Sequence, residues 1–406
     1  MWADPEELMA QAQLLRLRAA AVDEELSRAQ PWETLAVTAE AGLRVAVLGK
    51  DPDTAFAVAR LVAEVELGVL RVVARSAAVS LELDAIAEGY AGTARVLGVA
   101  EEAVTAGLAA LDRWAHDHPA VVERFAAAGH EVVLPVLLPA AERQGLLTES
   151  REHFVDLAFR PPVAADPPRG LGDLIATDVE VEQQDGLVRI TELTRADGSH
   201  AWVVAISGTQ VPGLRAGTNP FDITTDVRSI EAGATIAAIG VHRAVGQAQR
   251  STGRDTSSEP ILLTGHSLGG MLAAGLASDA SFRHGRNVTG VVTAGSPIGR
   301  IPVPAGVGVV AVEHRGDFVP ALDGVPGRSD REWHTLVKHP DRAATDGRSS
   351  RSHAGHLYTR SGEGLDASAV GTDRPWEEVI APFIGPGSTA LAHDVVLGRE
   401  WQNPRS

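Results

Sequence analysis

A serine between glycines carries the clearest chemical signal in this sequence. An apolar stretch at residues 261–264 leads into Gly265-His266-Ser267-Leu268-Gly269, and mostly small residues follow. This is a G-x-S-x-G motif in the setting that it requires, a strand that turns sharply into a helix. The two glycines leave room for the neighbouring backbone, so the hydroxyl stands clear of the sheet. We therefore predict Ser267 as a nucleophile, with Gly265, His266 and Gly269 forming the turn around it.

A serine hydroxyl needs a histidine base, and the base needs an acid that fixes its ring. After a turn of this type the chain order is serine, acid, histidine. Asp317 directly follows a predicted strand and is the leading candidate for the acid, with Asp323 and Asp330 as competitors. His353 and His356 both lie where a loop enters a late helix, and either could serve as the base. The remaining histidines near these motifs, which we expect to be structural or surface residues, are His266, His314, His334 and His339.

The negative oxygen of an acyl-transfer intermediate requires backbone donors. The amide of Leu268 begins the predicted helix after the nucleophile, where it can donate to that oxygen. An earlier apolar strand ends at Ser207-Gly208-Thr209, and Gly208 permits a tight turn there. We predict the amide of Leu268 and the amide or hydroxyl of Thr209 as the donors of an oxyanion hole.

Predicted strands and helices alternate around these motifs. Residues 187–194 and 200–207 flank a turn, Arg195-Ala196-Asp197-Gly198, and should form an antiparallel hairpin. A helix from about residue 222 to 249 and a strand at 261–264 follow. A helix from Leu268 and strands at 288–295 and 307–314 complete the pattern. Such alternation predicts an α/β fold, a mostly parallel sheet with helices on both faces.

The first third of the chain has a different texture. Apolar residues recur at alternating spacings of four and three along residues 8–26 and 58–90, which predicts an all-α helical bundle or hairpin. Four prolines in residues 159–170 interrupt both helix and sheet, so we place a boundary there. The predicted organisation is a helical accessory domain at 1–158, a proline-rich linker at 159–170, a catalytic domain at 171–390 and a C-terminal tail at 391–406.

Composition narrows the classes of partner and cofactor. The 406 residues carry a formal charge of -17, which repels nucleic acid, and they include no cysteine for disulfides or thiolate sites. No element carries histidines and carboxylates at metal-ligand spacing, so we expect neither metal nor other cofactor. The first ten residues, MWADPEELMA, are acidic where a signal peptide would be basic. We expect a cytoplasmic protein or export without a conventional signal peptide.

Together these motifs resemble the class 3 lipase family of the α/β-hydrolase superfamily over roughly residues 185–360. The matching segments are Ser207-Gly208-Thr209, Gly265 to Gly270, Gly295-Ser296-Pro297 and Asp317-Phe318-Val319-Pro320. The resemblance implies an α/β-hydrolase fold, Ser267 as nucleophile, Asp317 as acid, and Thr209 with Leu268 as oxyanion donors. The family has an arginine where this chain has Ser207. Its histidine precedes an aromatic residue, as both His353 and His356 precede Tyr358, and we prefer His353.

These features predict a serine hydrolase that cleaves a carboxylic ester of an acyl-ester or lipid substrate, as a lipase, esterase or phospholipase does. One alternative is an acyltransferase or thioesterase with the same residues. Another is a secreted effector whose helical region directs export or partner binding. That region resembles the hairpins of type VII secretion substrates, although Ala94 stands where their Tyr-x-x-x-Asp or Tyr-x-x-x-Glu element would place an acid after Tyr90. Self-association through the helical region is a further expectation.

Overall fold

The computed structural model describes residues 153–213, 215–230, 235–325, 327–368 and 374–401, together with residues 116, 142 and 147–149. All of them belong to the second of the two units into which the chain divides, Glu102–Ser406. Apart from residues 116, 142, 147–149 and 153–158, the predicted helical domain at 1–158 lies outside the described residues, and so do the repeats on which that prediction depends.

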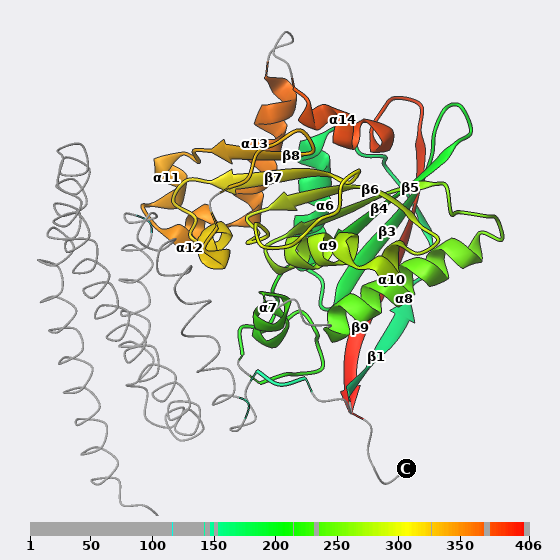
Figure 1. Cartoon of the computed structure of the whole chain (residues 1–406), viewed down its shortest axis with the longest axis horizontal. Coiled ribbons are helices and arrows are strands. Elements are labelled where there is room, and N and C mark those ends of the chain that lie inside the picture. Colours follow the sequence, from blue (N-terminus) through cyan, green and yellow to red (C-terminus); the bar gives the residue numbers. More distant parts are fainter. Residues whose placement is uncertain are drawn as a thin grey trace, which may run out of the picture. The chain divides into compact units, whose positions relative to one another are not determined.

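A mixed sheet of nine strands organises the described residues (Figure 1). The strand order is β1-β9-β3-β4-β5-β6-β7-β8, and β2 also pairs with β9. Strands β4 to β8 are parallel, whereas β1, β2, β9 and β3 pair antiparallel, so the predicted parallel arrangement holds for one half of the sheet. The strands are β1 (His153–Phe159), β2 (Val163–Ala165), β3 (Leu187–Thr194), β4 (His200–Ile206), β5 (Pro260–His266), β6 (Asn287–Ala294), β7 (Gly308–His314), β8 (Trp333–Lys338) and β9 (Thr389–Trp401).

Helices cover both faces of this sheet (Figure 1). Successive strand residues point to opposite faces, and the core divides accordingly. Val204 and Leu263 pack with α8 and α9 on one face, while Val203 and Leu262 pack with α6, α13 and α14 on the other. The helices are α6 (Leu171–Glu182), α7 (Ile223–Ile230), α8 (Ile236–Ser251), α9 (Leu268–Ser278), α10 (Ala280–Arg283), α11 (Arg342–Thr345), α12 (Ser349–Ser352), α13 (Gly355–Ala367) and α14 (Trp376–Ile380), with 3-10 turns η2 (Val319–Asp323) and η3 (Ala381–Phe383).

Several predicted elements are confirmed, and one is divided. β3 and β4 form the expected antiparallel hairpin, and β5, α9, β6 and β7 lie where the sequence indicates. The single helix expected at about 222–249 is instead two helices, α7 and α8. Thr235 adopts an extended conformation and its side chain accepts a hydrogen bond from the Ala238 amide, which caps a new helix at that point.

The sheet also extends beyond the predicted domain boundaries at 171 and 390. Residues 391–401, predicted as a tail, belong to β9, which lies between β1 and β3 and buries Val395 and Leu397 in the core. The proline-rich segment at 159–170 follows β1 and contains β2, so it is part of the sheet's periphery rather than a free linker. Proline has no backbone N–H to donate, so it is tolerated at the periphery of a sheet, where that hydrogen bond is not needed.

Candidate active site

Ser267 lies in the tight turn between β5 and α9. Its backbone has φ 54° and ψ -122°, a strained conformation that costs on the order of 1–3 kcal/mol and requires support from its surroundings. The two predicted glycines provide that support. A Cβ on Gly265 would lie 2.2 Å from the carbonyl carbon of Gly269, and a Cβ on Gly269 would lie 2.1 Å from the Ile206 oxygen. No side chain fits at either position.

The side chains of Ser267, His353 and Asp317 form a hydrogen-bonded series. Nε2 of His353 lies 2.9 Å from Oγ of Ser267, and Nδ1 lies 2.7 Å from Oδ2 of Asp317. Asp317 follows β7, and its side chain is fully buried, whereas the Ser267 residue keeps 9% of its surface exposed. The ring can thus accept the serine proton at one nitrogen while the carboxylate holds the other.

Asp317 accepts further hydrogen bonds that fix its carboxylate. The Tyr358 hydroxyl donates to Oδ2 over 2.7 Å, and the Val319 amide donates to Oδ1 over 2.9 Å. Burial, and then the charge of Asp317, raise the pKa of the Tyr358 hydroxyl well above its usual range, so the phenol remains a neutral donor. The Tyr358 ring stacks on His314, with ring centroids 3.7 Å apart. Tyr358, which the sequence marked only as an aromatic after the histidines, is therefore part of the site.

Opposing influences set the proton affinity of His353. Burial lowers its pKa, while the adjacent Asp317 carboxylate and the more distant Glu182 raise it, and the result lies above the ordinary imidazole value. Such a shift is typical of an imidazole that bonds a buried carboxylate.

His266 links the turn that carries Ser267 to His353. Its Nδ1 lies 2.9 Å from Oε2 of Glu182, and its Nε2 lies 2.9 Å from the carbonyl oxygen of His353. The His266 and His353 rings also lie close together, with centroids 4.6 Å apart. His266 thus has the structural position that the sequence predicts for it, whereas no sequence signal identified Glu182, 84 residues earlier on α6.

The predicted oxyanion turn directly follows β4. The Ser207 hydroxyl is buried and donates to the Leu187 carbonyl, and the Thr209 hydroxyl lies 2.9 Å from both carboxylate oxygens of Asp226 on α7. Burial raises the pKa of Asp226 to about 7, although the bond from Thr209 opposes this change. Leu268 is the first residue of α9, where an amide has no intrahelical acceptor. Nothing in the sequence drew attention to Asp226.

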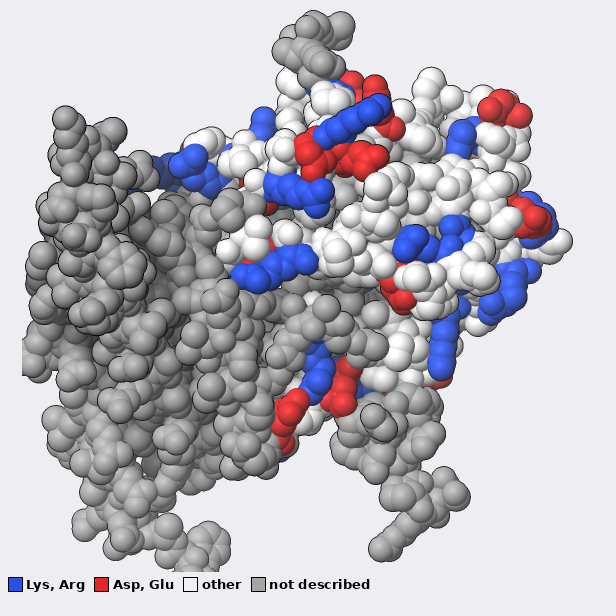
Figure 2. Space-filling view, viewed as in Figure 1, with Lys and Arg blue, Asp and Glu red and all other residues white. Residues whose placement is uncertain are grey.

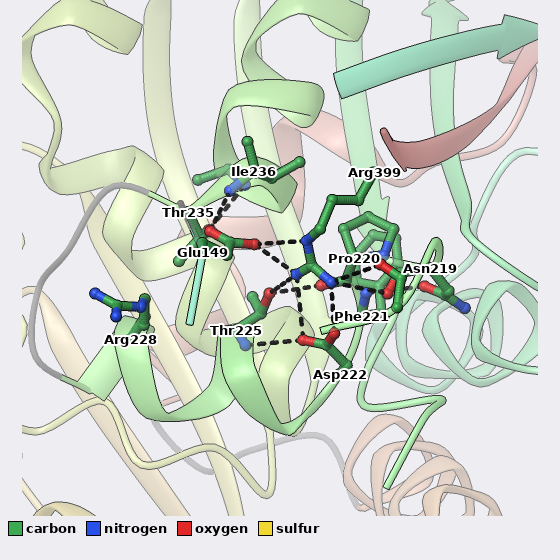
Figure 3. Close-up of polar contacts among 12 residues, drawn as sticks. Glu149, Asn219, Pro220, Phe221, Asp222, Thr225, Arg228, Thr235, Ile236 and Arg399 are labelled. Carbon is green, nitrogen blue, oxygen red and sulfur yellow. Dashed lines mark hydrogen bonds and ion pairs between the residues drawn. The ribbon is translucent and has the colours of Figure 1, made fainter. Parts of the chain in front are cut away.

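A buried cluster around Arg399 anchors the chain that follows this turn (Figure 3). The Arg399 side chain is 1% exposed, and its Nη1 lies 2.5 Å from Oδ2 of Asp222. Its Nε donates to Glu149 over 3.0 Å, and the other Glu149 oxygen accepts from the Ile236 amide at the start of α8. Arg399 also donates to the Thr225 hydroxyl over 3.2 Å. β9 therefore holds α7, which carries Asp226, in place beside the predicted oxyanion turn.

The competing candidates occupy other environments. His356 is exposed on α13, His339 is exposed after β8, and His334 is buried within β8. His314 bonds to the Ser352 carbonyl and the Ser361 hydroxyl. Asp323 accepts from the amides of Gly299 and Val325, and Asp330 accepts from those of Glu332 and Trp333. The described contacts therefore connect Ser267 to His353 and Asp317, and to none of these alternatives.

A cavity of about 530 Å³ lies beside this series. Thr209 and Gly355, two residues after His353, line it, and so do Glu182, Asp185 and His356. No lysine or arginine of the described chain lines the cavity. A bound molecule would meet polar and acidic groups there.

Within the ranges that the structure describes, no cluster of three or more histidines and carboxylates could hold a metal ion. None of the helices in those ranges combines the length and apolar character that a bilayer crossing requires. Comparison of the chain with protein-family models, with curated proteins and with solved structures gave no match.

Proposed function

We propose that this protein is a serine hydrolase of the α/β-hydrolase fold that cleaves a carboxylic ester through an acyl-enzyme on Ser267. The observation that carries the proposal is the series of bonds from Ser267 through His353 to Asp317, at 2.9 Å and 2.7 Å. The strained turn at the start of α9 and the parallel strands β4 to β8 agree with it.

In the proposed reaction, Oγ of Ser267 attacks the carbonyl carbon of the ester while Nε2 of His353 takes the hydroxyl proton. The amides of Leu268 and Thr209 stabilise the negative oxygen of the tetrahedral intermediate. His353 then returns the proton to the departing alcohol, which leaves an acyl group on Ser267. A water molecule, deprotonated by the same nitrogen, releases the acid and restores the serine.

The cavity favours a compact polar ester over a long acyl chain. Binding a long chain requires an apolar surface, because its affinity comes from removal of methylene groups from water. Among the described residues that line it, Val179 is the one large apolar side chain, whereas Glu182, Asp185 and His356 bring charged and polar groups. We therefore expect kcat/KM to be highest for short acyl groups in a series of chromogenic esters of graded chain length. A maximum at long chains would contradict this assignment of the cavity.

A fluorophosphonate probe tests the proposed nucleophile. Such a probe reacts with an activated serine, so we expect stoichiometric labelling of the wild type at Ser267, located by peptide mass spectrometry. Ser267→Ala should abolish labelling. Ser296→Ala makes the same substitution at another buried serine, which lies next to Gly270, and it should retain labelling. Labelling that persists in Ser267→Ala, or that fails in folded wild type, would contradict the proposal.

A further inference from the structure

A second cavity lies at the opposite end of the parallel strands from Ser267. Its volume is about 250 Å³, and its lining includes Gly246, Gln249 and Arg250 of α8 and Arg286 of the loop before β6. Ser267 follows the carboxyl end of β5, whereas α8 and the loops that line this cavity precede the amino ends of β5 and β6. A strand of seven residues is about 20 Å long. The second cavity is therefore separate from the proposed active site.

Arg286 is held at this cavity by uncharged partners. Its Nη1 donates to the Phe282 carbonyl over 2.7 Å and lies 3.3 Å from Nε2 of His242, and its Nε donates to Oε1 of Gln249 over 3.2 Å. The guanidinium also lies over the Phe282 ring, 4.8 Å from its centroid. Burial, followed by the charge of Arg250, lowers the pKa of Arg286. No carboxylate of the described residues forms an ion pair with this cation.

Arg250 brings a second guanidinium to the same place. A Cβ on Gly246 would lie 2.9 Å from Nη2 of Arg286 and 3.0 Å from Nη1 of Arg250. The ends of both side chains thus converge above a glycine in the middle of α8. Arg250 also lacks a carboxylate partner within the described ranges. Two cations this close repel each other unless an anion lies between them.

A buried amide adds an unused donor. Gln249 lines the cavity and is 6% exposed, and its Nε2 has no hydrogen-bond partner among the described residues. Its Oε1 already accepts from Arg286, so the amide is oriented with its donor unsatisfied. Buried donors of this kind are rare because each loses its bonds to water. An anionic oxygen would satisfy it.

The other charged groups of the lining do not neutralise the pair. Arg254 is already bonded to Glu259 and Glu192, so it contributes little positive charge. Asp255 is exposed, and its carboxylate accepts from the Ser257 amide instead of forming an ion pair. The uncompensated charge at this cavity is therefore that of Arg250 and Arg286.

We propose that this cavity binds a phosphate group, with Arg250, Arg286 and the Gln249 amide as its donors. Arginine is suited to phosphate because its planar guanidinium presents paired donors to the oxygens. A phosphate dianion balances the two guanidinium charges, whereas a single carboxylate balances only one of them. Figure 2 shows blue side chains gathered over the part of the surface where Figure 1 places α8 and α10. The phosphate comes from a soluble phosphoester or from a lipid headgroup.

Titration of the full chain with two soluble probes, inorganic phosphate and glycerol 3-phosphate, tests the proposal by calorimetry. Flotation with phosphatidylcholine vesicles, with and without phosphatidic acid, tests the headgroup source. We expect the wild type to bind one source. Arg250→Gln should weaken that binding roughly tenfold or more, as expected for the loss of a charge-assisted bond. Arg243→Gln is the matched control, because it removes the same charge from an exposed position of α8 outside the lining.

Gly246→Ala is a second variant that fills the space between the guanidiniums. Alanine is a better helix former than glycine, so the variant should fold, and it should lose binding as Arg250→Gln does. Ser267→Ala should bind phosphate as the wild type does, which separates this site from the proposed catalysis. Failure of every probe to bind the wild type, or equal weakening by Arg243→Gln, would overturn the proposal.

Discussion

The Tyr358 hydroxyl donates over 2.7 Å to Oδ2 of Asp317, the same oxygen that faces Nδ1 of His353. The Tyr358 oxygen in turn accepts from the His314 amide over 3.2 Å. The buried acid is therefore held by a phenol that is itself fixed by the end of β7. The bond from the Tyr358 hydroxyl restrains the Asp317 carboxylate in the orientation that keeps the His353 ring directed at Ser267.

We expect Tyr358→Phe to retain the fold and lose activity. The variant keeps the ring that stacks on His314 but removes one donor to a buried carboxylate, a bond worth roughly 1.5–3 kcal/mol. If about half of that loss reaches the transition state, kcat falls about 4- to 13-fold while KM stays near the wild-type value. Steady-state kinetics with a chromogenic short-chain ester measures both. An unchanged kcat would mean that the phenol has no part in positioning the acid.

The pKa of His353 predicts where activity declines on the acid side. The base must be neutral to accept a proton, so kcat/KM falls as pH drops through this pKa, which lies above the ordinary imidazole value of 6.5. Glu182→Gln removes a negative charge that favours the protonated ring, so it should move the decline to lower pH. Glu180→Gln removes the same charge from an exposed position on α6 and should leave the profile unchanged. The pH dependence of kcat/KM for the three proteins decides this, and a shift to higher pH in Glu182→Gln would contradict it.

Asp226 makes stability depend on pH in the opposite sense to most carboxylates. Its pKa is raised from 3.8 to about 7 by burial, so the folded state favours the protonated form. This favourable contribution is complete below the unfolded pKa and is lost as pH rises through about 7. Asp226→Asn should therefore raise the free energy of unfolding relative to wild type at pH 8, by up to about 4 kcal/mol, and have little effect at pH 4. Melting temperatures of both proteins at pH 4 and pH 8 test this, and an equal difference at both would refute it.

Removal of Arg399 should destabilise the protein more than removal of an exposed arginine. Arg399→Met leaves the buried carboxylates of Glu149 and Asp222 without their cation, which typically costs about 3–5 kcal/mol. Arg169→Gln breaks an ion pair whose arginine is 87% exposed, and it should change the free energy of unfolding far less than Arg399→Met does. Urea unfolding of both variants gives the comparison. Similar free energies of unfolding for the two would show that the cluster does not hold β9 and α7 together.

The sequence predicted the parts of the site whose signals are local. The Ser267 turn has glycines two residues away on each side, and Asp317 follows an obvious strand, so both could be found without the fold. The choice between His353 and His356 could not be made locally, because both precede the same helix by sequence pattern. In the structure His353 is the C-cap residue after α12 and precedes α13, whereas His356 lies in the first turn of α13. That difference directs one ring to Ser267 and leaves the other exposed.

The residues that sequence reasoning missed act through distant partners. Glu182 bonds to a histidine 84 positions away, and Arg399 bonds to an aspartate 177 positions away. A carboxylate on a helix or an arginine near the end of a chain has no local pattern that separates such a role from a solvated surface position. For the same reason the sequence predicts a tail at residues 391–406 where the structure has most of β9, since the pairing partners β1 and β3 lie far back in the chain.

The two late histidines provide the most direct test of the proposed Ser267, His353 and Asp317 series. If His353 is the base, His353→Ala should lower kcat for a chromogenic ester by about 10⁴-fold or more, as loss of the base does in enzymes with such a triad. His356→Ala, which removes an exposed imidazole from the cavity wall, should keep kcat within about tenfold of wild type. Both variants should have the circular dichroism spectrum of the wild type. Loss of activity in His356→Ala with retention in His353→Ala would contradict the account.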